Sequence, residues 1–230
     1  GIQMSARRSF SDALKTITFD SYSDYVFQNT KITDQNAVFD TEQSKKNNTY
    51  YFEDYTFSGL FKLSPKSELK FSSIYSNNNL NFKSQFKEIN QFTIDQLTIE
   101  NLGLNINYTT NWTEKFKSKL SASFSSYDFS YSGEELLDAF FSYETVKKNK
   151  TNDTNLSLDV DYKFNKNHSI MTGYDLIIND ISYTIGRLSD VIFDDDYTLE
   201  SLNSKNYTHS LFNEYRFKNK QFSIHTGLRT

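Results

Sequence analysis

The chain has 230 residues with 29 acidic and 25 basic side chains, and its formal net charge of −4 argues against nucleic acid as the main partner. The absence of cysteine excludes disulfide bonds, thiol catalysis and thiolate metal sites. Apolar residues make up only 37% of the chain and form no run of eighteen, which excludes a membrane-spanning helix and leaves little for the core of a soluble domain.

The N-terminal part divides into a strand and a long irregular segment. Residues 1–10 alternate as a β-strand does, so we expect a strand and not a signal peptide in this segment. Residues 11–50 are polar and aromatic, and we expect a large loop there, with one helical turn at residues 11–17.

Four hairpins follow, each predicted from two alternating strands and a short turn. Their extents are residues 55–75, 100–131, 156–178 and 211–228, with turns at residues 64–67, 109–115, 165–168 and 218–221. We expect long loops between them, at residues 77–97, 132–150 and 184–206.

The hairpin at residues 100–131 shows the pattern most clearly. Leu104 and Ile106 alternate with Asn105 and Asn107, and the same alternation continues in the second strand. Ordinary strands have about 5–6 residues, whereas strands that cross a bilayer need roughly 9–11. The alternation changes phase near residues 125–126, which predicts either a β-bulge or the point where the strand leaves the membrane.

Long strands, short turns on one side and long loops on the other are typical of outer-membrane barrels, whose periplasmic turns are short and extracellular loops long. Aromatic residues also cluster beside the short turns, for example Trp112, Tyr162 and Phe217. Such rings are favoured at a membrane interface, although aromatic residues favour strands in general. The predicted fold class is all-β, an antiparallel transmembrane β-barrel, with residues 1–230 forming one partial barrel domain of roughly nine strands.

Two short motifs go beyond this pattern. The run from Met4 to Asp12, with paired Arg7 and Arg8, resembles a strand of the TonB-dependent receptors of the Bacteroidota. The closing hairpin, residues 211–229, is similar to a hairpin of the same family and ends in Gly227, Leu228 and Arg229.

This resemblance implies a barrel of about 22 strands with a plug domain in its lumen. It also implies import of a scarce nutrient, with energy delivered through the plug by the TonB complex. The chain departs from the family because it contains no plug-like or TonB-contacting segment. We therefore expect the plug and the remaining strands to belong to a parent protein, with outer-membrane lipid and a surface lipoprotein as further partners.

The polar parity of the strands predicts which side chains face the lumen, because a charge that faces lipid is costly. The candidates are Arg8, Asn105, Asn107, Lys119, Asp159, Asp161, Glu214, Arg216, His225 and Arg229. Of the two adjacent arginines, we expect Arg8 in the lumen and Arg7 near a polar rim. Most of these charges are expected to form structural pairs.

Ligand contacts are expected from aromatic residues of the loops. The candidates are Tyr22, Tyr25, Phe27, Phe82, Phe86, Phe140, Phe141 and Tyr197. The acidic residues Asp194, Asp195 and Asp196 could bind Ca²⁺, but they lack the spacing of an EF-hand loop, and a solvated loop is favoured. No local catalytic motif is present, so we expect neither enzymatic activity nor a cofactor.

Three functions are compatible with these patterns. The first is part of a TonB-dependent transporter for a siderophore, vitamin, glycan or peptide. The second is an outer-membrane barrel that acts as a passive pore or as an assembly component that binds partners. The third is a soluble secreted β-rich adhesin, which would need shorter strands and a second sheet packed on the first.

Overall fold

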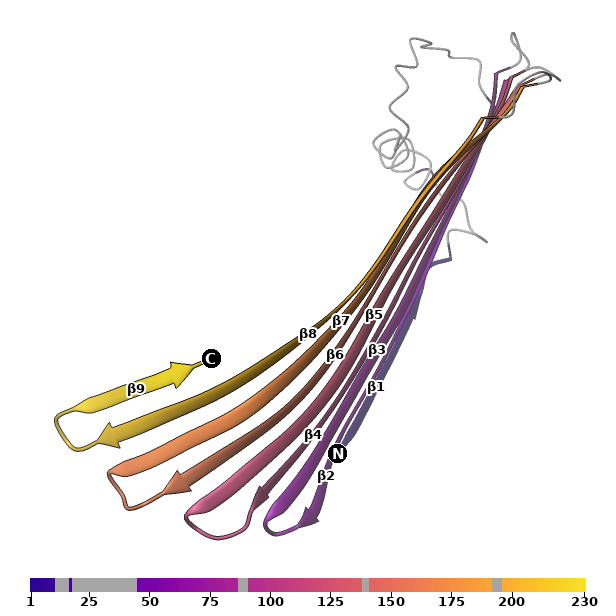
Figure 1. Ribbon diagram of the computed structural model, residues 1–230. Helices are drawn as coiled ribbons and strands as arrows, with labels where there is room; N and C mark the ends of the chain where they lie inside the picture. The colour runs from indigo at the N-terminus through magenta and orange to yellow at the C-terminus, as the bar shows by residue number, and fades with distance from the viewer. Residues whose placement is uncertain (11–16, 18–44, 87–90, 138–140, 192–195) are drawn as a thin grey trace.

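The computed structural model describes residues 1–10, 17, 45–86, 91–137, 141–191 and 196–230. Within these residues the chain forms nine antiparallel strands that follow one another in sequence order in one open sheet. The strands are β1 (Ile2–Arg8), β2 (Lys45–Ser64), β3 (Ser67–Phe86), β4 (Gln91–Asn111), β5 (Phe116–Leu137), β6 (Phe141–Lys163), β7 (His168–Val191), β8 (Asp196–Lys218) and β9 (Ser223–Arg229). Figure 1 shows the sheet as a single curved and twisted layer with four short turns at one end.

The four predicted hairpins are confirmed, and their turns are short. They connect β2 to β3, β4 to β5, β6 to β7 and β8 to β9. Side chains close these turns: Asn165 Oδ1 accepts hydrogen bonds from the backbone N–H groups of Asn167 and His168, at 2.9 and 3.1 Å. Asn219 Oδ1 does the same for Gln221 and Phe222. Asparagine stabilises tight turns in this way because its side chain accepts bonds from the backbone two and three residues on.

The strands extend further from the short turns than predicted. Most of residues 77–97, 132–150 and 184–206, which the sequence pattern assigned to long loops, lies in β3 to β8. These six strands have 20–24 residues each. The assignment was wrong because a strand that has left the membrane can be polar on both faces and still keep its backbone hydrogen bonds.

The phase change in β5 occurs without a β-bulge. Ser125 and Ser126 stay in continuous register with β4 and β6, so the bulge alternative is wrong. The one register shift in the β2–β3 pairing lies between Lys62 and Ser64, beside the turn.

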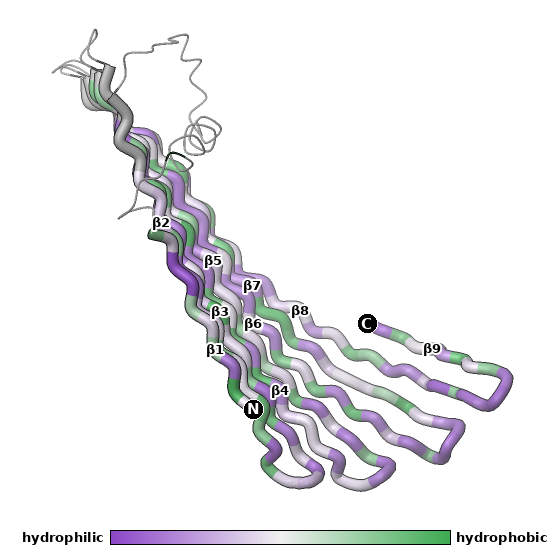
Figure 2. Tube along the Cα trace, turned by 180° about the vertical axis from the view of Figure 1, so that it is seen from behind, coloured by the Kyte–Doolittle hydropathy of each residue, from purple (hydrophilic) through white to green (hydrophobic). Residues whose placement is uncertain are grey.

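The sheet has two chemically distinct faces, because successive side chains alternate and cross-strand partners share a side. Figure 2 shows hydrophobic and hydrophilic residues interspersed along the strands. The apolar face carries Phe57, Phe71, Leu104, Ile106, Leu120, Phe124, Leu156, Leu158, Leu176 and Leu211. The polar face carries Asn105, Asn107, Ser121, Asp159, Asp175 and Glu214.

The apolar side chains near the short turns are not covered by a second layer. Leu120 is 53% exposed and Leu158 44%. Among the described residues only Leu80 and Tyr131 are buried hydrophobic side chains. A continuous exposed apolar band of this kind suits lipid as its solvent, and the two-layer arrangement that the adhesin hypothesis needs is absent from the described part of the chain.

Beyond this band, most apolar residues of β3, β4, β5 and β7 lie on the polar face. Leu97 and Ile99 in β4, Phe129 and Tyr131 in β5, and Ile181 and Tyr183 in β7 follow this rule. We call the group the far apolar cluster; it comprises Leu80, Leu97, Ile99, Tyr127, Phe129, Tyr131, Ile181, Tyr183 and Ile185.

Candidate functional site

The polar face near the short turns gathers nine of the ten predicted lumen-facing residues. The strand register puts Asn105 and Asn107 of β4, Lys119 of β5, Asp159 and Asp161 of β6, Glu214 and Arg216 of β8, and His225 and Arg229 of β9 on this one face. Their side chains are charged or hydrogen-bonding, and the register places Lys119 opposite the acidic Asp159.

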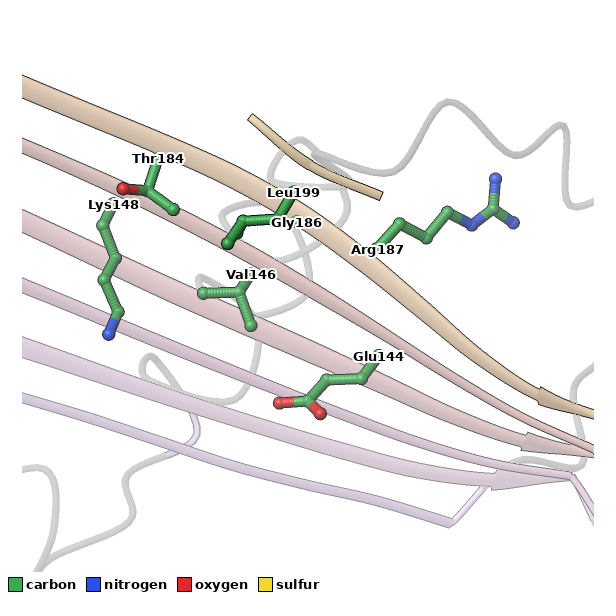
Figure 3. A pocket seen from close by; sticks show the side chains of 7 residues that line it. All are labelled: Glu144, Val146, Lys148, Thr184, Gly186, Arg187 and Leu199. Atoms are coloured by element: carbon green, nitrogen blue, oxygen red, sulfur yellow. The ribbon is translucent and has the colours of Figure 1, made fainter. Parts of the chain in front are cut away.

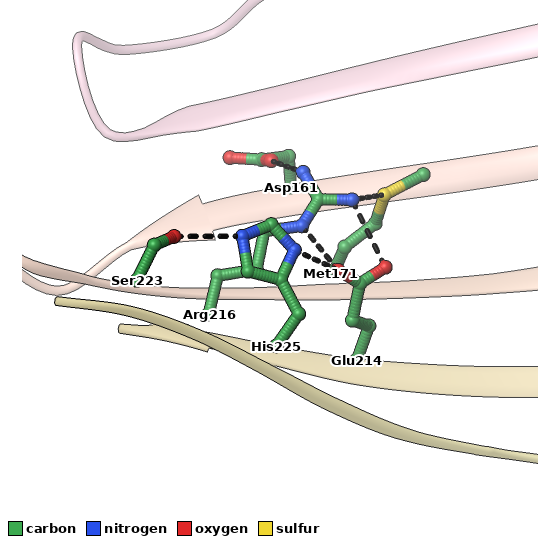
Figure 4. A network of polar contacts seen from close by, with 6 residues as sticks. All are labelled: Asp161, Met171, Glu214, Arg216, Ser223 and His225. Carbon is green, nitrogen blue, oxygen red and sulfur yellow. Dashed lines mark hydrogen bonds and ion pairs between the residues drawn. The ribbon is translucent and has the colours of Figure 1, made fainter. Parts of the chain in front are cut away.

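Arg216 is the centre of the densest network on this face (Figure 4). Its Nε and Nη2 atoms donate to the two carboxylate oxygens of Glu214, at 2.6 and 3.0 Å. Its Nη1 atom lies 4.0 Å from Asp161 Oδ2, and Nη2 lies 3.0 Å from the sulfur of Met171. This forked geometry fits a guanidinium group and a carboxylate, and it fixes both side chains against the sheet.

The network continues into β9. His225 Nδ1 lies 3.1 Å from Glu214 Oε1, and its Nε2 atom lies 3.2 Å from the hydroxyl of Ser223. Arg229 Nη2 donates to Asp175 Oδ2 at 3.2 Å. Charges of both signs are thus paired across four strands, and the surface that results is suited to water or protein and not to lipid.

The neighbouring strands carry neutral hydrogen bonds on the same face. Asn107 donates from Nδ2 to Asn105 Oδ1, and Ser121 donates to Asn107 Oδ1 at 2.7 Å. Lys119 lies opposite Asp159 in the register. Asp175 is a member of this site that the prediction missed, although its alternation with Tyr174 and Leu176 could have revealed it.

The two N-terminal arginines are placed the other way round from the prediction. Arg7 lies on the polar face, where it forms an ion pair with Asp54 and its guanidinium lies 5.3 Å from the ring centroid of Phe52. Arg8 lies on the opposite face, 4.8 Å from the ring centroid of Tyr51. The expectation that Arg8 faces the lumen was wrong. The strand β1 is short, and its sequence alone does not show which of the two adjacent arginines lies on the same face as the polar side chains of β2.

The predicted ligand loops are mostly strands or lie outside the described residues. Tyr22, Tyr25, Phe27, Phe140, Asp194 and Asp195 are outside the described part of the chain. Phe82 and Phe86 lie in β3, Phe141 in β6, and Asp196 and Tyr197 in β8, and not in loops. The described residues contain no group of three or more His, Cys, Asp or Glu side chains that could hold a metal ion.

Aromatic rings surround the short turns, as predicted. Tyr162 and Phe164 form an edge-to-face pair with ring centroids 5.2 Å apart, and the rings of His168 and Phe217 lie 4.9 Å apart. Trp112 Nε1 donates to Ser118 Oγ at 2.9 Å. Rings with an apolar body and a polar tip are favoured where a membrane meets water.

The far apolar cluster includes a buried tyrosine that is hydrogen-bonded to a half-buried carboxyl group. Tyr131, only 3% exposed, donates its hydroxyl hydrogen to Asp95 Oδ1 at 2.7 Å. Burial raises the pKa of the Asp95 carboxyl, and the hydrogen bond from Tyr131 opposes part of that rise. Burial and the bond to Asp95 also raise the pKa of Tyr131. No sequence pattern pointed to this pair.

A shallow hollow of about 370 Å³ lies on the other side of the sheet, far from the short turns (Figure 3). Its floor is Val146, Gly186 and Leu199, which are cross-strand neighbours, and Lys148 and Glu144 lie beside it. Gly186, which has no side chain, lies between the apolar Val146 and Leu199 in the register. The lining of the hollow does not assemble a nucleophile and a base.

No helix among the described residues is long and apolar enough to cross a membrane. No family model matches the sequence, and no curated protein matches it.

Solved structures resemble this fold. The ferric yersiniabactin uptake receptor FyuA from Yersinia pestis aligns with 81% of the chain at 7% identity and a TM-score of 0.52, and the aligned part is 29% of FyuA. The RagAB peptide transporter aligns with 78% of the chain at 11% identity and a TM-score of 0.51, and the aligned part is 31% of that chain.

These identities are low enough that the likeness concerns the fold alone. The chain spans about 30% of the length of these two structures. With its exposed apolar band, paired polar face and uninterrupted antiparallel order, it has the fold of part of the wall of an outer-membrane β-barrel like those of these two structures.

Proposed function

We propose that this chain is part of the wall of an outer-membrane TonB-dependent transporter that imports a scarce nutrient. The observation that supports this most is the contrast between its two faces on a sheet of this fold. One face exposes an apolar band to lipid, and the other pairs charges across β6 to β9, as a water-lined or protein-filled lumen requires.

The transported compound is proposed to be a siderophore, vitamin, glycan or peptide. The two solved structures are a ferric siderophore receptor and a peptide transporter, so both classes occur on this fold. We further propose that the plug, the rest of the barrel and the contact with TonB belong to the same parent protein of the Bacteroidota type. A surface lipoprotein is a proposed partner, and no catalytic role is proposed.

Uptake by cells that carry the intact protein tests this proposal. Labelled ferric siderophore, vitamin B12, oligosaccharide and peptide would be offered to cells with and without a functional TonB complex. We expect saturable uptake of one compound that stops when TonB is removed. Uptake that rises in proportion to concentration and persists without TonB would instead support the passive pore.

A matched pair of variants connects this assay to the site. Arg216→Gln removes the fork to Glu214 and the contact with Asp161, whereas Lys148→Gln removes an exposed charge at the far end of the sheet. We expect the first to lower uptake and the second to leave it unchanged, at equal amounts of protein in the membrane. Equal uptake by both variants would show that the Arg216 network has no part in transport.

A further inference from the structure

The short-turn end of the sheet carries a repeated basic pattern. Each hairpin has one lysine at the end of a strand and one in or beside the turn. The strand-end residues are Lys62, Lys117, Lys163 and Lys218, and the turn residues are Lys66, Lys115, Lys166 and Lys220. We call these eight residues the lysine rim. The four segments that contain it, residues 62–66, 113–117, 163–167 and 218–222, include one acidic residue, Glu114.

The rim differs in charge from the rest of the chain. The whole chain has more acidic than basic residues, and yet eight of its 25 lysine and arginine residues lie in these twenty positions. All eight side chains are exposed, and none forms an ion pair with a described residue. Asp161, which lies opposite Lys117 in the register, is 4.0 Å from Arg216 instead.

The register also decides which way the rim faces. Lys117 pairs with Asp161, and Lys218 shares its parity with Arg216, so both lie on the polar face. Lys62 and Lys163 lie on this face too. At the same end the apolar face carries aromatic residues, including Phe116, Tyr162 and Phe217. The strand-end lysines are therefore directed away from the surface that lipid headgroups would contact.

Neighbouring hairpins are two strands apart, so their lysines repeat about every 10 Å along the rim. That interval is close to the Debye length of about 8 Å at physiological salt, so a row of carboxylates would interact with each lysine pair nearly independently. A protein surface or an acidic segment can present carboxylates at this spacing.

We propose that the lysine rim is a docking surface for an acidic polypeptide on the short-turn side of the membrane, which is the periplasmic side if the proposed function is right. The rim exists in the sheet whether or not the protein transports a nutrient. Electrostatic docking of this kind raises the association rate and depends strongly on salt.

Binding of a labelled twenty-residue polyglutamate peptide tests the proposal. The intact protein would be placed in phosphatidylcholine nanodiscs, where both sides of the membrane are accessible. Two variants each change four lysines to glutamine, one at the turn positions and one at the strand-end positions. The matched control changes Lys83, Lys148, Lys150 and Lys205, which are exposed lysines far from the rim.

We expect both rim variants to weaken binding by about fourfold or more. Each exposed ion pair contributes about 1.4-fold to 5-fold to the affinity, and four pairs are lost. The control variant should bind polyglutamate as tightly as the unchanged protein does. Added salt should weaken the binding of polyglutamate to both of these proteins. Persistence of the compact form on unheated gels would show that all three variants are folded.

Three results would overturn the proposal. The first is equal binding by the rim variants and the control. The second is that the protein preferentially retains phosphatidylglycerol and does not bind polyglutamate, and that the rim variants lose this lipid. That result would identify a surface for lipid headgroups. The third is tighter binding of peptidoglycan fragments than of polyglutamate, which would identify a cell-wall contact.

Discussion

Replacement of Leu158 by arginine tests whether the apolar face is in lipid. Leu158 is 44% exposed on that face. It lies six residues before Phe164 in the turn, which is about 20 Å along the strand. With a strand tilt of about 40°, this puts Leu158 roughly 15 Å above the turn, near the middle of an apolar band about 25 Å tall.

We expect Leu158→Arg to lower the free energy of unfolding by about 2–4 kcal/mol, the cost of a lysine or arginine at the bilayer midplane. Ser157→Arg moves the same side chain to the polar face one position away, and should cost about 1 kcal/mol or less. Leu199→Arg is the second control, since Leu199 is 52% exposed on the same face but far above the band.

Unfolding of the intact protein in phosphatidylcholine vesicles by guanidinium chloride, followed by the gel shift of the folded form, measures these differences. If Leu199→Arg costs as much as Leu158→Arg, depth has no influence and the band is not immersed in lipid. If Ser157→Arg is the more costly variant, the two faces have been assigned the wrong way round.

Two further predictions concern the polar face and the far apolar cluster. In Gly173→Ala the new methyl group would overlap the ring of Phe212, so we expect a loss of about 1–3 kcal/mol in the same unfolding assay, largely relieved by adding Phe212→Ala. Because the pKa of Asp95 is raised in the folded protein, its carboxyl should contribute stability that is fully present below about pH 3.9 and is lost as pH rises through the folded pKa. Tyr131→Phe removes the donor and should make that decline larger, whereas Asp95→Asn should abolish it; a decline that persists in Asp95→Asn would assign it to another group.

The hairpins were predictable because alternation is a local property of the chain. Leu104 and Ile106 against Asn105 and Asn107 define two faces without knowledge of any partner strand. Nine of the ten lumen-facing candidates lie on one face for the same reason; that this face lines a lumen stays a prediction. Arg8 failed because its strand has seven residues and a mixed neighbourhood, so only pairing with Glu53 reveals its side.

The strand ends could not be predicted, because a strand with water on both faces need not alternate apolar and polar residues. Its backbone hydrogen bonds to the neighbouring strands leave no pattern in the sequence. Asp95 and Tyr131 lie on neighbouring strands and are 36 positions apart in the sequence, and neither residue is unusual in its own segment. The lysine rim was missed for a related reason. Its residues are scattered over four turns, and the sequence shows no basic cluster until strand pairing aligns them.

In β4, β5 and β7 the change of apolar face along the strand specifies its alignment twice. A strand that slipped by one residue during assembly would turn its polar side chains towards lipid near the turns. The same slip would also remove Phe129 and Ile181 from the far apolar cluster. One slip thus has two independent energetic costs. Polar side chains would face lipid near the turns, and apolar side chains would leave the far apolar cluster at the other end of the strand. A sequence of this kind carries an internal check against one-residue slips, because such a slip removes both halves of the strand from the surroundings that suit them.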